Sequence, residues 1–357
     1  MEFSKRLLLW YDEHGREFSW RNKRDPYPVW VSEIILQQTR IGQGMAYYHR
    51  FMETFPDIYI LASASEKEVL RVWQGLGYYS RARNMHHTAK TIVNKHKGMF
   101  PGSSKELLSL KGIGHYTAAA IASIVYDEAV PAIDGNVYRL LARLFALNDS
   151  FDTSKGKKTF RELADKLIPL NRPGDFNQAM MDFGSLVCRP LNPLCEQCIF
   201  NDECVAFLQN KVHQYPLRSE KRPVRHRYFN YFLIEYNDPA GMQLFYASQR
   251  KDDDIWKHMY ELPLLETDTA MPRQDVFLHP WWKTLFPGNI GYSVSGHVSE
   301  KKHQLSHQLI HARLFFVKVT SPLINTKLDK IFMAVDADSF DLLPKPRLLE
   351  HLLNNVM

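Results

Sequence analysis

The chain reads Leu110-Lys111-Gly112-Ile113-Gly114-His115-Tyr116-Thr117-Ala118 at the point that decides the fold of its first part. This stretch lies between a short predicted helix from Lys105 and a longer one through Tyr126. Gly112 and Gly114 allow a tight turn that aims free N–H groups at the start of the second helix, where the helix dipole also favours an anion. We predict a helix–hairpin–helix whose natural anion is a nucleic-acid phosphate. A plain turn between two packed helices is the alternative.

Around this motif, helical periodicity extends from Pro28 to about Leu208, and Ser103 with Glu106 predicts a capping box ahead of the short helix. The chain is long enough for about two domains. At 215–227 the sequence becomes polar, basic and rich in proline, which is typical of an exposed linker. We therefore expect an all-helical first part that ends at this linker.

The part beyond the linker, 228–357, has a different character. Residues typical of strands are concentrated at 228–236, 244–249, 308–320 and 330–335. A helical segment at 347–356 follows two prolines. This pattern predicts a second domain of mixed α and β structure.

The composition of the chain bears on its expected partners and location. Lys and Arg exceed Asp and Glu by 45 to 39, and the net charge of +6 fits a polyanion partner as well as it fits many enzymes of small molecules. The first 20 residues contain only a four-residue apolar run, which is too short for a signal peptide or a membrane span. We expect a cytoplasmic protein without a membrane partner.

The 4 cysteines of the chain form one cluster with the spacing Cys-x6-Cys-x2-Cys-x5-Cys, at Cys188, Cys195, Cys198 and Cys204. Disulfides are not expected, because the N-terminus carries no export signal. Zinc sites usually contain two Cys-x2-Cys pairs, whereas one pair flanked by two lone thiolates can wrap a cube-shaped cluster. The spacing predicts a metal site and favours iron–sulfur over zinc.

Two acids stand out in the helical part. Asp134, in Ile133-Asp134-Gly135-Asn136-Val137, precedes a predicted helix, so N-capping is its ordinary interpretation, and a catalytic role can coexist with it. Glu33 has mostly apolar neighbours, and burial there would raise its pKa. A carboxyl that stays protonated near neutral pH can act as a general acid, while a more polar carboxylate stabilises positive charge. The alternative for Glu33 is a simple first-turn helix acid.

Taken together, the motifs resemble those of the MutY-type adenine DNA glycosylases, in the endonuclease III-like helix–hairpin–helix superfamily. They are the hairpin, 133–137, the cysteine run, Ser32-Glu33 with 36–39, and 75–84. The resemblance implies a helical core of two domains with the active site between them. A six-helix domain would span 25–130, and 1–24 with 131–214 would form a domain holding a [4Fe-4S] cluster.

The same resemblance implies removal of adenine mispaired with 8-oxoguanine or guanine in double-stranded DNA. Glu33 would protonate adenine at N7, which makes the base a better leaving group. Asp134 would stabilise the oxocarbenium-like cation, electrostatically or through a transient covalent bond. Asn136 would orient the carboxylate of Asp134. The family pattern describes a monomer located at the nucleoid, and no clamp or mismatch-repair partner can be identified from the sequence.

The residue at position 116 distinguishes lyase-competent subfamilies from monofunctional ones. Lyase-competent relatives place a lysine at this hairpin position to form a Schiff base, which a phenol cannot form. We therefore expect a monofunctional glycosylase that leaves an abasic site. Weak strand nicking by the nearby Lys111 is left open as an alternative. A Tyr116 that only packs on the hairpin is the alternative. The rival functions are an endonuclease III-like lyase and a catalytically silent damage-binding protein.

Further contacts are expected by similarity. The residues expected to contact DNA are Gln38, Thr39, Leu76, Tyr78, Gly112 and Gly114. Of these, Gln38 and Tyr78 resemble wedges that offset the cost of extruding the adenine, although a helix-terminal amide and a loop aromatic are their ordinary interpretations. The adenine pocket would include Trp20, Arg21 and Gln178, with a core role equally open for Trp20.

The second domain loosely resembles the MutT/Nudix-like lesion-recognition domain of the same family. It lacks the glutamate-rich Nudix box, so we expect it to bind without hydrolysing a nucleotide. Leu305-Ser306-His307 corresponds to the family's Phe-Ser-His loop, with Leu in place of Phe. Ser306 and His307 are therefore the candidates for contacting 8-oxoguanine opposite the adenine.

Overall fold

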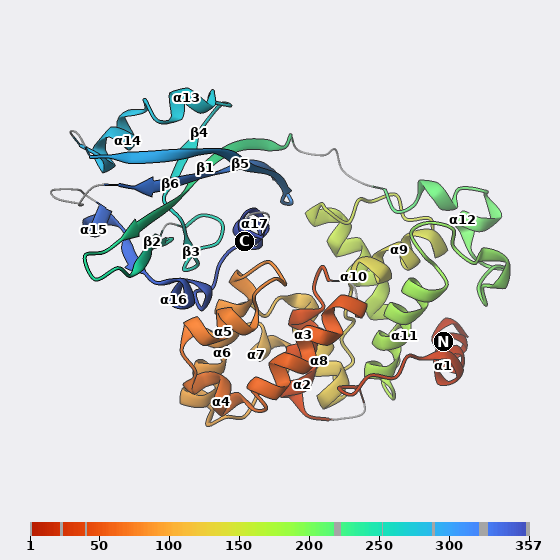
Figure 1. The fold of residues 1–357 in the computed structure, drawn as a ribbon. Helices are drawn as coiled ribbons and strands as arrows, with labels where there is room; N and C mark the ends of the chain where they lie inside the picture. The colour runs from red at the N-terminus through yellow and green to blue at the C-terminus, as the bar shows by residue number, and fades with distance from the viewer. Residues whose placement is uncertain are drawn as a thin grey trace. The chain divides into compact units, whose positions relative to one another are not determined.

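A computed structural model describes residues 2–21, 24–39, 41–217, 223–251, 253–287, 290–320 and 328–354 (Figure 1). Residues 218–222 of the expected linker and 355–356 of the last expected helix lie outside these ranges. The chain divides into two compact units. The first comprises Met1–Ser63 with Asn84–Lys221, and the second comprises Ala64–Arg83 with Arg222–Met357.

The described part of the first unit is helical, as the periodicity predicted. Its α-helices are α1 (Glu2–His14), α2 (Pro26–Ile35), α3 (Ile41–Thr54), α4 (Ile58–Ser63), α6 (Ser80–His96, whose first turn belongs to the second unit), α7 (Ser104–Leu107), α8 (His115–Tyr126), α9 (Gly135–Leu144), α10 (Ser154–Leu167), α11 (Pro173–Leu186) and α12 (Val205–Leu208). Short 3-10 turns lie at Cys195–Gln197 and Val212–Gln214. Helix α1 was not predicted from the sequence.

Side-chain caps explain where several helices begin. Asp25 accepts a hydrogen bond from the Tyr27 amide, ahead of a proline at the first position of α2. Ser103 accepts one from the Glu106 amide at α7, at the position that the sequence predicted. Thr153 does the same for α10. The caps satisfy backbone N–H groups that the helices leave without partners, and so fix the first turns.

One buried core joins α1 to α9, α10, α11 and the cysteine segment. Phe3 packs against Phe176 and Phe200 with ring centroids 6.3 and 4.7 Å apart. The N-terminal helix therefore belongs to the same core as residues nearly two hundred positions later. Its apolar face is short, which is why sequence periodicity alone did not identify it.

The second unit contains helix α5 (Glu66–Val72) and a seven-stranded sheet. The strands are β1 (Arg225–Asn237), β2 (Gln243–Gln249), β3 (Tyr260–Glu261), β4 (Leu264–Thr267), β5 (Tyr292–Gln304), β6 (Gln308–Val319) and β7 (Met333–Val335). The main order is β3-β2-β1-β6-β5, while β4 pairs with β1 and β7 with β2. Strands β1 and β6 run parallel, and β5 and β6 form an antiparallel hairpin.

The α-helices α13 (Arg273–Val276), α14 (Pro280–Leu285), α15 (Leu328–Ile331), α16 (Ala337–Asp341) and α17 (Arg347–Leu353) complete this unit. Side chains alternate along β1, so that Phe229 and Tyr231 join the core beneath α17 and Phe232 joins the core beneath α14. The mixed α and β character was predicted correctly (Figure 1).

The sequence prediction of the second unit was incomplete, because it lacked β3, β4, β5 and the helices α13 to α16, and it placed one strand start wrongly. The strand predicted from 330 begins only at Met333, because the preceding residues form α15. Strand β5 was missed because its side chains are mostly exposed and lack an alternating apolar pattern. In the described residues, no helix is long and apolar enough to cross a membrane.

Candidate active site

A cavity of about 470 Å³ in the first unit gathers most of the site residues that the sequence predicted there. Those on its wall are Trp20, Arg21, Glu33, Gln38, Thr39, Tyr116, Asp134, Asn136 and Gln178. They come from α2, α8, α9, α11 and the segments beside them. The fold therefore brings together residues that are spread over more than 150 positions of the chain.

Glu33 lies near the end of α2, where Ile34 and Ile35 are buried, and it keeps a partly exposed edge toward the cavity. Desolvation raises the pKa of Glu33 to about 6, with the neighbouring Asp134 acting in the same direction. A hydrogen bond with Tyr116 and the charge of Arg21 oppose this rise. The result is a carboxyl that is protonated in about one molecule in ten at pH 7, far more often than an ordinary glutamate.

Tyr116 lies in the first turn of α8, directly after the hairpin. Its hydroxyl donates to the sulfur of Met181 at 3.1 Å and also bonds to Glu33. Burial, followed by the nearby carboxylates, raises the pKa of Tyr116 well above its ordinary value. The phenol therefore stays neutral and serves as a hydrogen-bonding neighbour of Glu33.

Asp134 is the N-cap of α9 and faces the cavity as well. Its Oδ1 accepts from the amides of Asn136 and Val137, both at 2.8 Å, and its Oδ2 accepts from Nδ2 of Asn136 at 2.7 Å. Burial raises the pKa of Asp134, and these three bonds lower it in part because they favour the charged carboxylate. Capping and facing the cavity thus coexist in one residue.

Asn136 is in turn held by Arg139. The amide oxygen of Asn136 accepts from Nη2 of Arg139 at 2.9 Å, and the same guanidinium donates to the carbonyls of Gly184 at 2.6 Å and Cys188 at 2.7 Å. Arg139 is only 8% exposed. The cavity carboxylate is therefore tied through two side chains to the backbone of the first cysteine.

Gly184 on α11 makes this arrangement possible. A Cβ there would lie 2.8 Å from both Cβ and the carbonyl oxygen of Asn136. Any larger residue would push α11 away from the start of α9. The close helix approach places the Gly184 carbonyl within reach of Arg139.

A third acid, Asp182, fixes two arginines of the cavity wall, Arg16 and Arg21. Arg21 donates to its two oxygens at 2.7 and 2.9 Å, and Arg16 donates to the same carboxylate. Asp182 is fully buried, and hydrogen bonds from both arginines lower its pKa despite burial, which is the largest opposing effect. Trp20 is buried and stacks on Phe18 at 4.8 Å, so it is a core residue that also forms part of the cavity wall.

Gln178 on α11 is 4% exposed, and its Oε1 atom has no hydrogen-bond partner among the described residues. A buried carbonyl oxygen without a partner costs about 1–3 kcal/mol, so such atoms are uncommon in folded proteins. The side chain lines the cavity. A ligand that donates an N–H group at this point would remove the cost.

The predicted DNA-contacting residues of the first unit lie at turns. Gln38 is exposed and has a φ of 56°, in the left-handed region, beside the partly exposed Thr39. Gly112 has a φ of 81°, and a Cβ there would lie 2.5 Å from Cβ of Asn84. Gly114 precedes α8, whose N-terminus has no side-chain cap. The predicted hairpin is confirmed.

In the second unit, the structure brings Tyr78 and Ser306 together. Tyr78 is 49% exposed, has a φ of 49°, and lies between Gly77 and α6, while Leu76 is buried. Ser306 and His307 are exposed on the turn that joins β5 to β6. The hydroxyls of Tyr78 and Ser306 are 3.0 Å apart. Two residues predicted from separate motifs are thus neighbours.

The 4 cysteines surround a second cavity. Nη1 of Arg143 lies 3.5 Å from the sulfur of Cys188, and the Phe200 amide donates to the sulfur of Cys198 at 3.4 Å. Burial raises the pKa of Cys198 to about 12, and the other three thiols add to this effect. Protein groups therefore already supply positive charge and N–H donors to these sulfurs.

Arg139, Asp182 and Met181 are the residues that the sequence interpretation missed. An arginine in the first turns of an amphipathic helix looks like a solvent-exposed charge, so Arg139 gave no signal. Asp182 did carry one, because it is a lone acid within the apolar run Ala179-Met180-Met181-Asp182-Phe183. Such a residue is rarely buried without a partner, here Arg16 and Arg21.

Residues 31–169 match the model of the HhH-GPD superfamily base excision DNA repair proteins. The solved structure of a thermostable thymine-DNA glycosylase is similar over 58% of this chain and 96% of its own, with a TM-score of 0.54 and 28% identity. The helical unit is therefore a DNA glycosylase core of this superfamily.

Relatives of this chain indicate which kind of DNA glycosylase it is similar to. The adenine DNA glycosylase of Buchnera aphidicola subsp. Schizaphis graminum is 33% identical over 266 residues, which cover 74% of this chain and 75% of that protein. That of Buchnera aphidicola subsp. Acyrthosiphon pisum is 29% identical over 359 residues, covering 99% and 98%. The chain belongs to the adenine DNA glycosylase family of base excision repair enzymes.

Proposed function

We propose that this glycosylase hydrolyses the N-glycosidic bond of adenine mispaired with 8-oxoguanine or guanine and leaves an abasic site. The observation that carries the proposal is one cavity that holds two acids in different environments beside the unpaired Oε1 atom of Gln178. Adenine offers an exocyclic N–H donor for Gln178 and a ring nitrogen for an acid. Guanine instead has an acceptor oxygen, O6, at the corresponding exocyclic position, and this atom cannot donate a hydrogen bond to Gln178.

Glu33 acts as the general acid in this proposal. Its pKa of about 6 keeps a proton available near neutral pH, and Tyr116 beside it fixes the direction of the carboxyl. Protonation at N7 converts the departing base from an anion into a neutral molecule. General acid catalysis of this kind contributes about 10²- to 10⁴-fold to the rate.

Asp134 stabilises the positive charge that develops on the sugar as the bond stretches. Its three hydrogen bonds favour the ionised form, and Arg139 holds Asn136 in place, so the carboxylate is fixed before the substrate arrives. Water then completes hydrolysis. Asp134 and Glu33 thus divide the work of charge stabilisation and proton donation.

The monofunctional outcome is supported by the lining of the cavity. A lyase needs a lysine that forms a Schiff base with the sugar. The lining residues in the described part of the chain include Tyr116 but no lysine. Strand scission is therefore not expected without alkali.

The test is base release from a duplex with one adenine opposite 8-oxoguanine, scored for strand scission directly and after alkali, beside a duplex with adenine opposite thymine. Alkali-dependent cleavage at the mispaired adenine alone is the expected result. Direct scission would overturn the monofunctional assignment. Tight binding without base release would point instead to a silent damage-binding protein.

We further propose that Cys188, Cys195, Cys198 and Cys204 hold a [4Fe-4S] cluster. The four cysteines line one cavity, and one Cys-x2-Cys pair flanked by two lone thiolates favours a cube-shaped cluster over a zinc ion. When bound, the cluster would fix the loop beside Arg189 for contact with DNA. Iron and acid-labile sulfide analysis of the purified protein, with Cys198→Ser as control, tests this assignment, and zinc alone would overturn it.

The sheet of the second unit is proposed to be a MutT/Nudix-like domain that reads 8-oxoguanine through Ser306 and His307. Their exposure on a hairpin turn supports a reading role. The domain divisions at 1–24 with 131–214, 25–130 and 228–357, a monomeric state, and location in the cytoplasm at the nucleoid complete the proposal. The shared core of α1 with α9 to α11 supports the first division.

A further inference from the structure

The turn that carries Ser306 is held at its base by a side chain. The Arg225 amide donates to the carbonyl of His307 at 3.0 Å, and the Leu305 amide donates to that of Gln308 at 2.8 Å. The side-chain oxygen of Gln308 then accepts from Nη1 of Arg227 at 3.1 Å. Gln308 therefore connects the turn to a neighbouring strand through Arg227.

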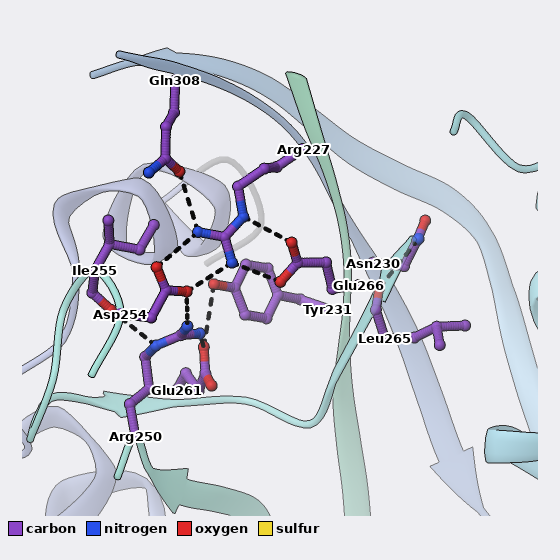
Figure 2. A network of polar contacts seen from close by, with 10 residues as sticks. All are labelled: Arg227, Asn230, Tyr231, Arg250, Asp254, Ile255, Glu261, Leu265, Glu266 and Gln308. Carbon is purple, nitrogen blue, oxygen red and sulfur yellow. Dashed lines mark hydrogen bonds and ion pairs between the residues drawn. The ribbon is translucent and has the colours of Figure 1, made fainter. Parts of the chain in front are cut away.

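Arg227 belongs to a buried ion network (Figure 2). Its side chain is 5% exposed and pairs with Asp254 and Glu266, each at 2.6 Å. The guanidinium lies over the ring of Phe229 at 4.9 Å. The two carboxylates are about one-third exposed, but the guanidinium itself is buried, so Arg227 has little freedom to move because leaving these partners would leave its own buried charge unpaired.

Arg250 continues the network into the loop after β2. It pairs with Asp254 at 3.0 Å and with Glu261 at 2.7 Å, and it donates to the carbonyl of Ile255 at 3.0 Å (Figure 2). In the same loop Trp256 and His258 have φ values of 59° and 66°. Large residues adopt this left-handed conformation only where surrounding contacts enforce it. The network thus imposes a defined shape on residues 253–258.

That loop also holds the segment that carries Tyr78. The carbonyl of Lys257 accepts from Arg83 at 2.7 Å, and Nδ1 of His258 lies 2.5 Å from Oε1 of Glu66. These contacts flank Tyr78 on both sides in the chain. One continuous set of polar contacts therefore runs from the turn of Ser306, through both arginines, to the segment of Tyr78.

We infer that Arg227 is a positioning residue for lesion reading, which acts through Gln308 to hold the Ser306 turn at a fixed place relative to Tyr78. The inference rests on the proposed reading of the base opposite adenine. Its specific content is that the network sets the preference for 8-oxoguanine over guanine, whereas a network that only stabilises the domain would affect unfolding alone.

Gln308→Leu tests this role with little risk to folding. It removes the acceptor, while Arg227 keeps both carboxylates, so no buried charge loses its ion-pair partner. Single-turnover excision is measured opposite 8-oxoguanine and opposite guanine with the full chain. We expect the ratio of the two rates to fall about threefold, less than the loss of the Ser306 hydroxyl itself because Gln308 acts indirectly, with the guanine rate unchanged.

Gln243→Leu is the matched control. It makes the same chemical change at the exposed start of β2, away from the network. Both variants are also compared with the wild type in thermal unfolding and in amide hydrogen exchange. Gln308→Leu is expected to speed exchange at residues 304–309, and Gln243→Leu to leave both exchange there and the rate ratio unchanged.

The outcomes separate the inference from the function on which it rests. A wild type that excises adenine equally fast opposite both bases overturns the proposed lesion reading and this inference together. A wild type with a preference that survives in Gln308→Leu overturns the inference alone. A lower melting temperature with an unchanged ratio does the same, because it assigns the network to stability only.

Discussion

The proposed catalytic cavity and the Ser306 turn use polar groups in opposite ways. In the cavity, Glu33 and Asp134 are largely buried in its wall, and burial raises the pKa of both. On the turn, Ser306 and His307 are exposed, and the adjacent Gln308 accepts a hydrogen bond from Arg227 of the ion network (Figure 2). Proton donation needs a desolvated acid, whereas reading a base still in the duplex needs a group that can reach it.

The two regions also differ in how much their polar groups lower the stability of the folded protein. In the cavity, the Oε1 atom of Gln178 has no hydrogen-bond partner among the described residues, and two acids are desolvated, and both effects lower the stability of the protein. Ser306 and His307 on the turn are exposed, so they do not have this desolvation cost. Changes in the cavity should therefore alter the chemical step, and changes at the turn should alter preference between substrates.

The largest effect is expected for Asp134→Asn. Asparagine caps a helix as well as aspartate does, so α9 should remain folded. The variant lacks the negative charge opposite the sugar cation, and its single-turnover rate of adenine release should fall on the order of 10⁴-fold, as for other catalytic carboxylates. Thermal unfolding serves as the control. An unchanged rate would remove Asp134 from the mechanism.

Glu33→Gln should lower the rate by about 10²-fold and change its dependence on pH. The active form of a general acid is protonated, and the pKa of Glu33 is raised to about 6. The wild-type rate should therefore be highest below that pH and fall about tenfold per unit above it. On the acid side, the rate should fall as Asp134 is protonated, at a pH above the ordinary carboxyl range because burial raises its pKa.

The fall in the single-turnover rate at high pH tests whether Glu33 is the general acid. It should disappear in Glu33→Gln, which cannot titrate, and persist in Tyr116→Phe, which keeps the carboxyl. Profiles of single-turnover rates between pH 5 and 9 would reveal this. If this fall is identical in Glu33→Gln and the wild type, another group supplies the proton.

Much of the cavity could be predicted from sequence because its signals are local. Gly112 is recognisable by the turn it permits, and Asp134 by its place before a helix. The cysteines are recognisable by spacing alone. Arg139 could not be predicted, since its importance comes from contacts with Asn136 and with a carbonyl 49 positions along the chain.

The second unit was less predictable for a physical reason. Strand β6 is buried on both faces, and its apolar run predicted it almost to the residue. Its partner β5 is exposed, so its hydrogen bonds to β6 define it and its side chains do not. The ion network had no sequence signal either, because Arg227, Asp254 and Glu266 are ordinary charges in the sequence until the fold buries the arginine between the two carboxylates.

Gln178→Leu should separate stability from recognition within the cavity. Replacing a buried unpaired amide oxygen by a methyl group should raise the free energy of unfolding by about 1 kcal/mol. The same change removes the acceptor for the adenine amine, so KM should rise about tenfold with a smaller effect on kcat. Urea unfolding and steady-state kinetics measure the two effects. A loss of stability with unchanged KM would mean that the oxygen already has a partner.

The smallest direct effect is expected at the turn, from Ser306→Ala compared with Tyr78→Phe. Both variants remove the hydroxyl contact of 3.0 Å between these residues, but only the first removes a hydroxyl from the proposed reader. If Ser306 contacts 8-oxoguanine itself, Ser306→Ala should lower the 8-oxoguanine to guanine rate ratio about fivefold, near 1 kcal/mol, while Tyr78→Phe leaves it nearly unchanged. Equal losses in the two variants would show instead that Ser306 acts by holding Tyr78, and the turn would then be a support for the wedge and not a reader of the base.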